Sequence, residues 1–287
     1  MKSAEVTLER WSRWQGAVFG GLALLFIMGG MWLVVLLGLG AAPFLSIPGL
    51  NALLSAYWQP LAGHFGILPM VVGSVLVTLL ALGLAIPFAL GVAVSVQFGL
   101  AARFRAPAID GLTVLTAVPS VVFGWWGLDL VVPTIRQVFG GPGFSVLAAG
   151  IVLATMLIPT LGLLFRMALA AVPTAWVEGS LALGATEDQT LWHIIFRCQV
   201  GALGRAVMMA VARAMGETMA VQMVIGGQPL WPHSLTAPGA TLTTTLLTDM
   251  AVFPPGVAGH AAIDALALAL LVLMGLWVYF SERWGGI

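Results

Sequence analysis

Long apolar stretches alternate along the chain with short polar segments. Each stretch is long enough for a helix of about 20 residues, the length that crosses the hydrocarbon layer of a bilayer. The pattern predicts an all-α integral membrane protein in which a short N-terminal segment, residues 1–15, precedes one membrane domain, residues 16–287. The six expected spans cover residues 16–39, 71–98, 112–132, 145–165, 203–226 and 261–280.

The composition excludes an ordinary soluble domain. Hydrophobic residues make up 60% of the chain and charged residues only 8%, and the mean hydropathy is +1.06. The third expected span is the least regular, although buried membrane helices tolerate proline and glycine. Its interruptions are Pro119, Gly124, Gly127 and Asp129.

The positions of lysine and arginine predict the orientation. If the N-terminus is inside, nine of the 11 basic residues fall on the cytoplasmic side, as the positive-inside rule requires. Arg136 alone falls outside, and Arg213 lies within the fifth span. We therefore expect both termini to be cytoplasmic. The nine inner residues are Lys2, Arg10, Arg13, Arg103, Arg105, Arg166, Arg197, Arg205 and Arg283.

Few features suggest processing, metal binding or catalysis. The first apolar run is longer than the core of a signal peptide, about 7–15 residues, so we expect it to remain as a span. The single cysteine, Cys198, excludes an internal disulfide and any site with several thiolates. The histidines show no pairing at i, i+4, so no metal site is expected. Walker and hydrolase motifs are missing, so we expect no ATP hydrolysis by this chain, no cofactor in it and no nucleic-acid partner.

The connection between the fourth and fifth spans, residues 166–202, lies on the predicted inner side. It is too polar for lipid, because it carries both acidic and basic residues. Pro173 suits a helix start, and apolar residues recur on both sides of Gly184. The pattern predicts a short helix, a turn near Gly184 and a second helix.

This loop resembles the "EAA" loop of ATP-binding-cassette (ABC) importer permeases. The resemblance rests on Glu178-Gly179-Ser180, then Gly184, then Ile194-Ile195. It implies a coupling helix that contacts a cytoplasmic ATPase through Glu178, Gly179, Ser180 and Gly184. A solvated hairpin between two spans is the alternative. Glycine and serine replace the two alanines of the motif, and Phe196-Arg197-Cys198 replaces its usual leucine and proline.

Four segments, in the same order, closely resemble PstC, the permease subunit of phosphate importers. A general importer permease shares the coupling loop but not the run Arg-x-x-Gly-Glu-Thr-Met-Ala-Val that begins at Arg213. The resemblance implies the type I ABC importer permease fold. The segments are "GSVLVTLLALGLAIPFALGVAVSV" (73–96), "AVPSVVFGWWGL" (117–128), "AAGIVLATMLIP" (148–159) and "ARAMGETMAVQMVIGG" (212–227).

The same run places two charged residues, Arg213 and Glu217, inside an apolar span. A charge at the centre of a span costs about 2.5–3.5 kcal/mol on insertion scales, so such residues usually mark a transport path. Four-residue spacing predicts that both side chains are buried on one helical face, and Gly216 would let a helix or a solute approach. Arg213 would bind an oxyanion with its planar fork of donors. Glu217 would either position Arg213 or donate a hydrogen bond while protonated. The alternative is an ion pair that only locks helix packing.

Two hydroxyl residues are further candidates for this path. Ser120 follows Pro119, where a helix break would free backbone N–H groups for an oxyanion. Thr218 directly follows Glu217. Either hydroxyl could instead bond its own helix backbone.

The external segment between the fifth and sixth spans, residues 227–260, contains no lysine or arginine. Its threonine-rich part, "TAPGATLTTTLLTDM", is compatible with a short re-entrant or surface helix. Its role stays open.

The resemblance to PstC implies a permease subunit of a phosphate importer in the bacterial inner membrane. The implied partners are a second, related permease, two copies of an ATPase that binds ATP and Mg, and an external phosphate-binding protein. Another oxyanion, namely molybdate, tungstate or sulfate, is an alternative substrate. An intramembrane enzyme for lipid phosphates is an alternative class, but the chain offers no convincing pair of nucleophile and base.

Overall fold

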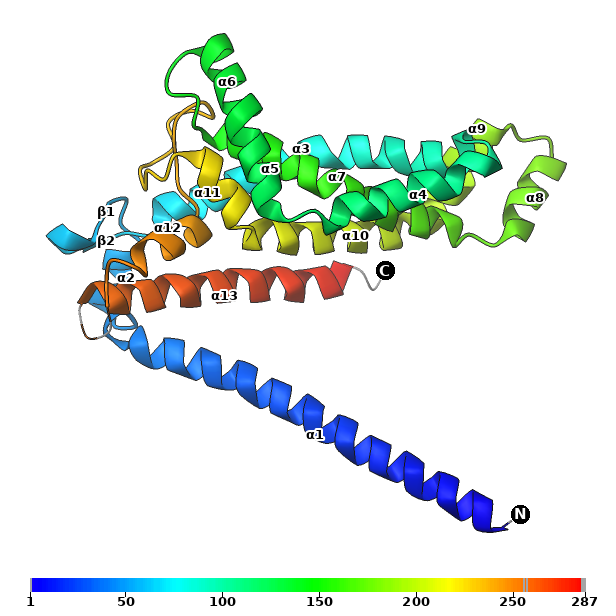
Figure 1. Ribbon diagram of the computed structural model, residues 1–287, viewed down its shortest axis with the longest axis horizontal. Helices are drawn as coiled ribbons and strands as arrows, with labels where there is room; N and C mark the ends of the chain where they lie inside the picture. Colours follow the sequence, from blue (N-terminus) through cyan, green and yellow to red (C-terminus); the bar gives the residue numbers. More distant parts are fainter. Residues whose placement is uncertain (1, 255, 257, 285–287) are drawn as a thin grey trace.

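The chain folds into helices that mostly run side by side, with connections gathered at two opposite ends (Figure 1). The computed structural model describes residues 2–254, 256 and 258–284. The outermost residues of the predicted domain ranges, 1 and 285–287, therefore lie outside the described residues. The long helices are α1 (Lys2–Gly40), α3 (Leu68–Val94), α4 (Ala102–Ala117), α7 (Val146–Ala170), α10 (Phe196–Gly216) and α13 (Ala258–Trp284).

The apolar helices confirm a membrane protein with several spans. Five described helices are long and apolar enough to cross a membrane, or six if one sharply bent pair counts as a single span. The expected spans at 16–39, 71–98 and 261–280 fall within α1, α3 with its final π-helical turn η3 (Ser95–Gly99), and α13, and the span at 145–165 begins at the N-cap residue of α7.

Helices α3 and α7 form the centre of the molecule and pack along most of their length. A side chain at Gly150 would meet Leu80 Cβ at 2.8 Å, so glycine permits their close approach. Along the most apolar part of α7, 67% of residues are buried, the highest share of any described span. Helix α7 is therefore the element around which the others assemble.

The third expected span, 112–132, is sharply bent. Helix α4 ends at Ala117, and α5 (Ser120–Trp126) begins after a bend of 88°. Val118 adopts an extended conformation with ψ 128°, because the ring of a following proline disfavours the helical region. The chain then continues through the π-helical turn η4 (Gly127–Val131) into α6 (Val132–Phe139).

The fifth expected span, 203–226, is also interrupted. Helix α10 ends at Gly216, Glu217 is extended with ψ 126°, and α11 (Met219–Ile225) follows. The prediction of one continuous helix here is therefore wrong. No proline marks this break.

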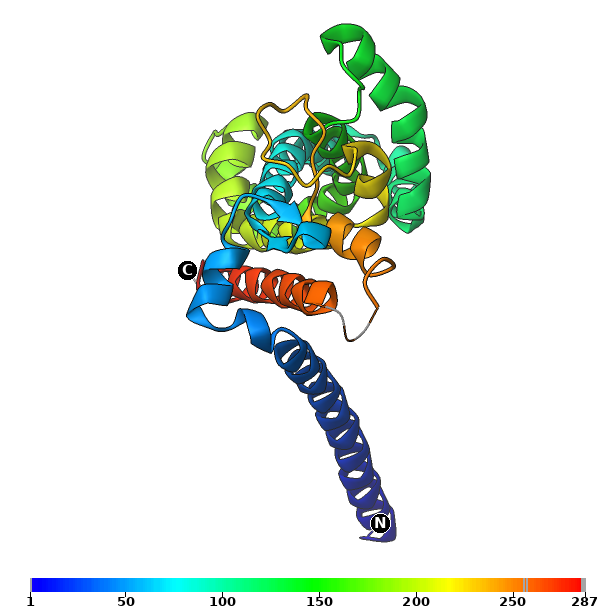
Figure 2. The same cartoon turned by 90° about the vertical axis from the view of Figure 1, so that its left-hand side faces the viewer.

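The first helix, α1, leans away from the body in both views (Figures 1 and 2). None of its apolar stretch, Val18–Gly40, is buried within the chain. It joins the body at its C-terminal end, where a side chain at Gly40 would collide with Asp264 of α13.

Short elements build one end of the molecule, which we call the hairpin end. They surround an antiparallel pair in which Trp58 of β1 (Trp58–Gln59) lies opposite Phe65 of β2 (His64–Phe65). A second apolar cluster lies beneath them. The other elements of this end are η1 (Ala42–Phe44), α2 (Ile47–Leu53), η2 (Pro60–Ala62) and α12 (Leu242–Asp249).

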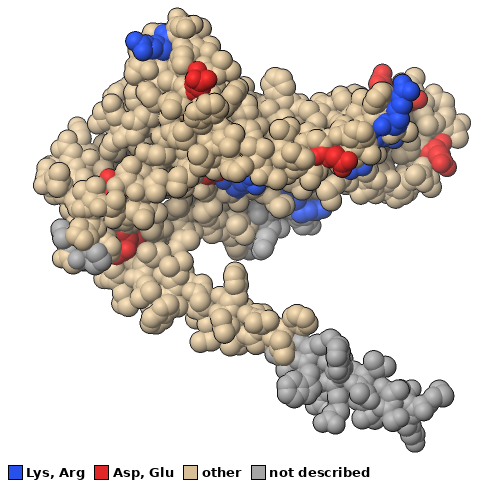
Figure 3. Space-filling view, viewed as in Figure 1, with Lys and Arg blue, Asp and Glu red and all other residues tan. Residues whose placement is uncertain are grey.

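The opposite end, which we call the α8–α9 end, is formed by residues 171–195. Helix α8 (Thr174–Ala182), a turn at Gly184, and α9 (Glu187–Thr190) with the π-helical turn η5 (Leu191–Ile195) follow one another. The predicted helix, turn and second helix are confirmed. On the face seen in Figure 3, charged side chains gather toward this end.

Candidate functional site

The break between α10 and α11 explains why a chain so poor in charge carries Arg213 and Glu217 here. Arg213 occupies the last turn of α10, and Glu217 directly precedes α11. The carbonyl end of a helix stabilises a cation, and the N–H end stabilises an anion. Each charge therefore lies at the helix end that favours it.

Glu217 acts as a cap on α11. Its Oε1 accepts a hydrogen bond of 3.1 Å from Ala220 N–H, one of the N–H groups that a helix start leaves without an internal partner. Its own N–H donates to Ala214 O at 3.3 Å. The carboxylate is half-buried and is committed to the backbone of the following helix.

Arg213 lies elsewhere than predicted. Its side chain is exposed on α10, and within the described part of the chain it forms no ion pair with Glu217 or any other acid. The predictions that both side chains are buried and share one helical face are therefore wrong, because α10 ends between them. Arg213 lies on an exposed stripe of α10 with Arg205, Met209 and Gly216.

Gly216 closes α10 and faces α13. A side chain there would meet only the Met274 methyl group, at 3.4 Å, which is ordinary contact. Thr218 is half-buried, and its hydroxyl donates to Gly216 O at 3.3 Å. The hydroxyl thus bonds the local backbone, as one of the two alternatives for this residue expected.

The threonine-rich segment returns into the molecule as α12. Residues 241–245 are all buried, and Thr241 forms a capping box with Thr244. The Thr243 hydroxyl donates to Glu217 O at 3.1 Å, while Ser74 of α3 accepts a hydrogen bond of 2.9 Å from Leu242 N–H. This segment therefore holds the break between α10 and α11 on one side and α3 on the other.

A small polar cavity lies at this junction. Its volume is about 10 Å³, which is room for about one water molecule. Hydroxyl groups supply most of its polar character. The lining includes Ser74, Thr78, Glu217, Thr241 and Thr243.

Ser120 begins the second broken span. Helices α5 and α11 run parallel, because Gly124 approaches Ala220 and Gly127 approaches Val224. Because Gly124 is the fifth residue of α5 and Ala220 the second of α11, the start of α5 lies near the level of the break before α11. A side chain at Gly124 would come within 3.0 Å of Ala220 Cα, so glycine permits this contact. Ser120 is half-buried at this level.

The α8–α9 end presents the other predicted residues. Glu178 and Gly179 are exposed on α8, and Ser180 shares a hydrogen bond of 3.0 Å with Thr190 of α9. Gly184 has φ +88°, and nothing lies within 4 Å of where its side chain would be. The serine therefore ties the two helices together, while the glycine permits a left-handed turn.

Sequence reasoning missed the buried hydroxyls Ser74, Thr78, Thr241 and Thr243. One signal was available, because Ser74 and Thr78 are four residues apart in an otherwise apolar helix and therefore share a face. The threonine run pointed to a helix but not to its burial. In the described residues, no group of three or more His, Cys, Asp or Glu side chains could hold a metal ion.

Comparison with known proteins identifies relatives. Residues 111–284 match the family described as "Binding-protein-dependent transport system inner membrane component". The chain is 34% identical over 274 residues to "Probable ABC transporter permease protein YqgH" of Bacillus subtilis, covering 91% of this chain and 88% of that one. It is 30% identical over 230 residues to "Phosphate transport system permease protein PstC" of Xylella fastidiosa, covering 73% and 71%.

A solved structure shares the fold. An inward-facing form of the MetNI methionine ABC transporter superposes with a TM-score of 0.59 at 16% identity, covering 84% of this chain and 98% of that chain. The likeness supports the predicted importer permease fold.

The cap on α11 gives a first prediction. Glu217→Ala removes the acceptor for Ala220 N–H and should lower stability by about 1 kcal/mol, as the loss of a helix cap usually does. Glu217→Gln keeps an oxygen in the same place and should lose less. Thermal unfolding of the purified protein in detergent measures both. Equal losses for the two variants would show that the charge matters and the cap does not.

Proposed function

The chain belongs to the family of binding-protein-dependent transport system inner membrane components, and from that premise we propose that it is the permease subunit of a phosphate importer. A permease of an ABC importer is a transporter membrane subunit and not an enzyme. Phosphate is the proposed substrate because relatives named as phosphate permeases match most of the chain, and because the break between α10 and α11 carries an arginine.

The single observation that carries the substrate proposal is the exposure of Arg213 deep in an apolar span. Arg213 lies in the last turn of α10, and α11 adds seven further residues before the connection to the hairpin end begins. A lipid-facing arginine at that depth is costly. A second, related permease that covers this stripe of α10 would enclose Arg213 in a polar path between the two subunits.

The chemistry of the stripe suits weak binding of an oxyanion. Arg213 offers planar donors for two oxygens of one phosphate. Glu217, at the adjoining helix start, repels the same anion. A transport path must bind its cargo weakly enough to release it, so the pair favours passage over retention. Gly216, Thr218 and Ser120 complete the proposed path at the level where the two broken spans meet.

We propose an orientation with the α8–α9 end in the cytoplasm and the hairpin end outside, which places both termini inside. The basic residues support this orientation, since Arg103, Arg105 and Arg197 lie at helix starts near the α8–α9 end. The bacterial inner membrane is the proposed location.

Reporter fusions test this orientation. Fusions after residues 105 and 190 should report cytoplasm, whereas fusions after residues 55 and 235 should report the exterior, because these positions alternate between the two ends of the helices. Reporter activity and expression are measured on the same cells. An exterior signal at residue 190 would contradict both the orientation and the ATPase contact proposed next.

The α8–α9 end suits a contact with a cytoplasmic ATPase, which would bind ATP and Mg. Its surface combines the carboxylate of Glu178 with apolar side chains that have no cover in the chain, including Leu183 at 91% exposure. Exposed apolar groups near charged ones are typical of a docking surface. We propose that two ATPase copies serve the two permeases.

Gly184 provides the test of coupling. Gly184→Val forces a branched side chain into a left-handed turn, a strain of about 1–3 kcal/mol, and should abolish stimulation of ATP hydrolysis by the loaded binding protein while the complex still assembles. Gly184→Asn should retain most activity, because asparagine tolerates this conformation. Gly111→Ala, at an exposed position of α4 with open space around it, is the control. Normal coupling by the valine variant would make the loop a simple connector.

Uptake of labelled phosphate by the assembled importer tests the substrate. Arg213→Lys keeps the charge but loses the two-pronged donor geometry, and we expect uptake to fall at least about 10-fold, the loss that 1.4 kcal/mol produces. The amount of assembled complex should stay unchanged. Met209→Leu, on the same exposed stripe of α10, is the matched control.

Two results would overturn the substrate proposal. Wild-type uptake by Arg213→Ala in fully assembled complex would exclude an anion contact. Uptake of sulfate, molybdate or tungstate in preference to phosphate would show that the substrate is another oxyanion, while the proposed path would still stand.

A further inference from the structure

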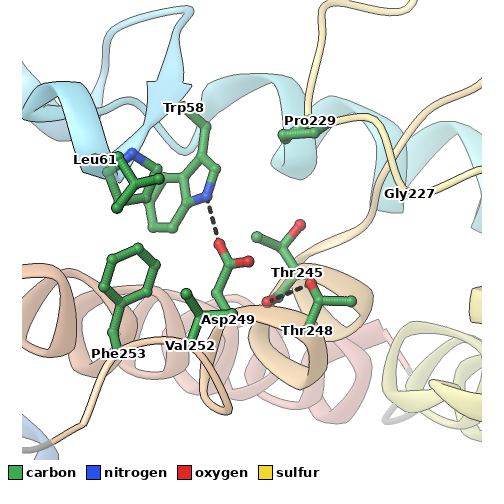
Figure 4. A pocket seen from close by; sticks show the side chains of 10 residues that line it. Trp58, Leu61, Gly227, Pro229, Thr245, Thr248, Asp249, Val252 and Phe253 are labelled. Carbon is green, nitrogen blue, oxygen red and sulfur yellow. Dashed lines mark hydrogen bonds between the residues drawn. The ribbon is translucent and has the colours of Figure 1, made fainter.

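A pocket of about 250 Å³ opens at the hairpin end, apart from the path through α10 and α11 (Figure 4). Its walls come from three segments that are distant in sequence: the β1–η2 segment, the connection after α11, and α12 with the residues that follow it. The lining residues include Trp58, Leu61, Pro229, Thr248, Asp249 and Phe253.

One carboxylate provides the charge of this pocket. Asp249 is half-buried, and its Oδ2 accepts a hydrogen bond of 2.7 Å from Trp58 Nε1. In the described part of the chain, no hydrogen bond to its other oxygen is found. Segments 41–70 and 227–254 contain no lysine, no arginine and no other acidic residue. Asp249 is therefore the one carboxylate of these two segments, and it lies in the pocket.

The rest of the pocket is shaped for an apolar stem. Leu61, which is 90% exposed, and Pro229 stand beside Trp58 at its rim, and Phe253 lies on the opposite side (Figure 4). Arginine and lysine combine an apolar stem with a cationic tip, and aromatic faces and a carboxylate both attract that tip. A divalent metal ion would require several oxygen ligands, whereas this pocket supplies one carboxylate.

We propose that this pocket receives a basic side chain of the external binding protein on which the transporter family depends. The inference rests on the proposed function, since it needs the hairpin end to face outward. Asp249 would form the ion pair, and the rim around Leu61 would cover the stem. The negative charge of Asp249 favours a partner protein that presents an exposed lysine or arginine to this surface.

The pocket is also connected to the transport path. Asp249 ends α12 and Thr243 lies near its start, and Thr243 holds Glu217 O at the break between α10 and α11. A partner that pulls on Asp249 therefore acts on the helix that holds the break. The same short helix, α12, therefore carries the docking residue at one end and the contact with the break at the other.

The test uses the complete importer in lipid nanodiscs and titrates it with purified, phosphate-loaded binding protein while ATP hydrolysis is measured. Asp249→Asn removes the charge but keeps an oxygen for Trp58 Nε1–H. We expect the half-saturating concentration to rise about 10-fold or more and its salt dependence to weaken, because charged contacts at an interface are screened by salt. Basal hydrolysis and assembly should not change.

Two matched controls separate charge from structure. Trp58→Phe breaks the hydrogen bond to Asp249 but keeps the charge, so it should retain the wild-type salt dependence. Asp129→Asn removes a negative charge from the exposed surface near α6, outside the pocket, and should leave the titration unchanged. If Asp249→Asn matches the wild type, or if Trp58→Phe reproduces its defect, the proposal is overturned.

The two proposals fail differently. If the wild type responds to a binding protein loaded with another oxyanion and not to the phosphate-loaded one, the proposed substrate is wrong. The same titration with that protein then decides the docking proposal. A cross-linker on Leu61→Cys in a Cys198→Ser background should capture the binding protein next to a lysine or arginine. Capture through a segment without basic residues would contradict the ion pair.

Discussion

The interruption of a membrane span at Glu217 is the constraint on which the rest of the structure depends. Inside a bilayer no water satisfies the backbone groups that a helix break leaves free, so protein groups must do so. Glu217 Oε1 accepts from Ala220 N–H, and the Thr243 hydroxyl donates to Glu217 O. Without these two contacts, a break at this depth would leave polar groups unpaired at a cost of about 1–3 kcal/mol each.

That constraint explains why α12 enters the molecule. A hydroxyl must reach Glu217 O from outside the broken helix, and Thr243 does so because residues 241–245 fold back among α3, α11 and α13. Burial of this segment requires a further hydrogen bond, because Leu242 N–H at the start of α12 needs an acceptor. Ser74 provides it, 168 residues away in sequence. The threonine run thus converts one local break into a connection between helices from both halves of the chain.

These long-range demands also mark the limit of prediction from the sequence. Spans such as 145–165 are predictable because lipid selects for apolar runs, and the turn at Gly184 is predictable because local signals surround it. The bend at Pro119 carries its own signal as well. The break at Glu217 carries only weak local signals, Gly216 and the cap from Glu217 itself, and one of its contacts comes from Thr243, which is distant in sequence. The sequence pointed to Arg213 and Glu217 because charged residues are rare in lipid-facing spans. It did not predict that the two residues belong to different helices.

The hydrogen bonds around α12 also determine the size of the cavity beside Glu217. This cavity of about 10 Å³ holds about one water molecule, so it admits no larger solute while α12 stays in place. To widen the cavity, α12 must part from α3 or from the break, which exchanges the bond to Ser74 or the bond to Glu217. Each is a neutral hydrogen bond with a net worth of about 0.5–1.5 kcal/mol. Because these two bonds are individually weak, separating α12 from α3 and from the break would cost only about 1–3 kcal/mol in hydrogen bonding.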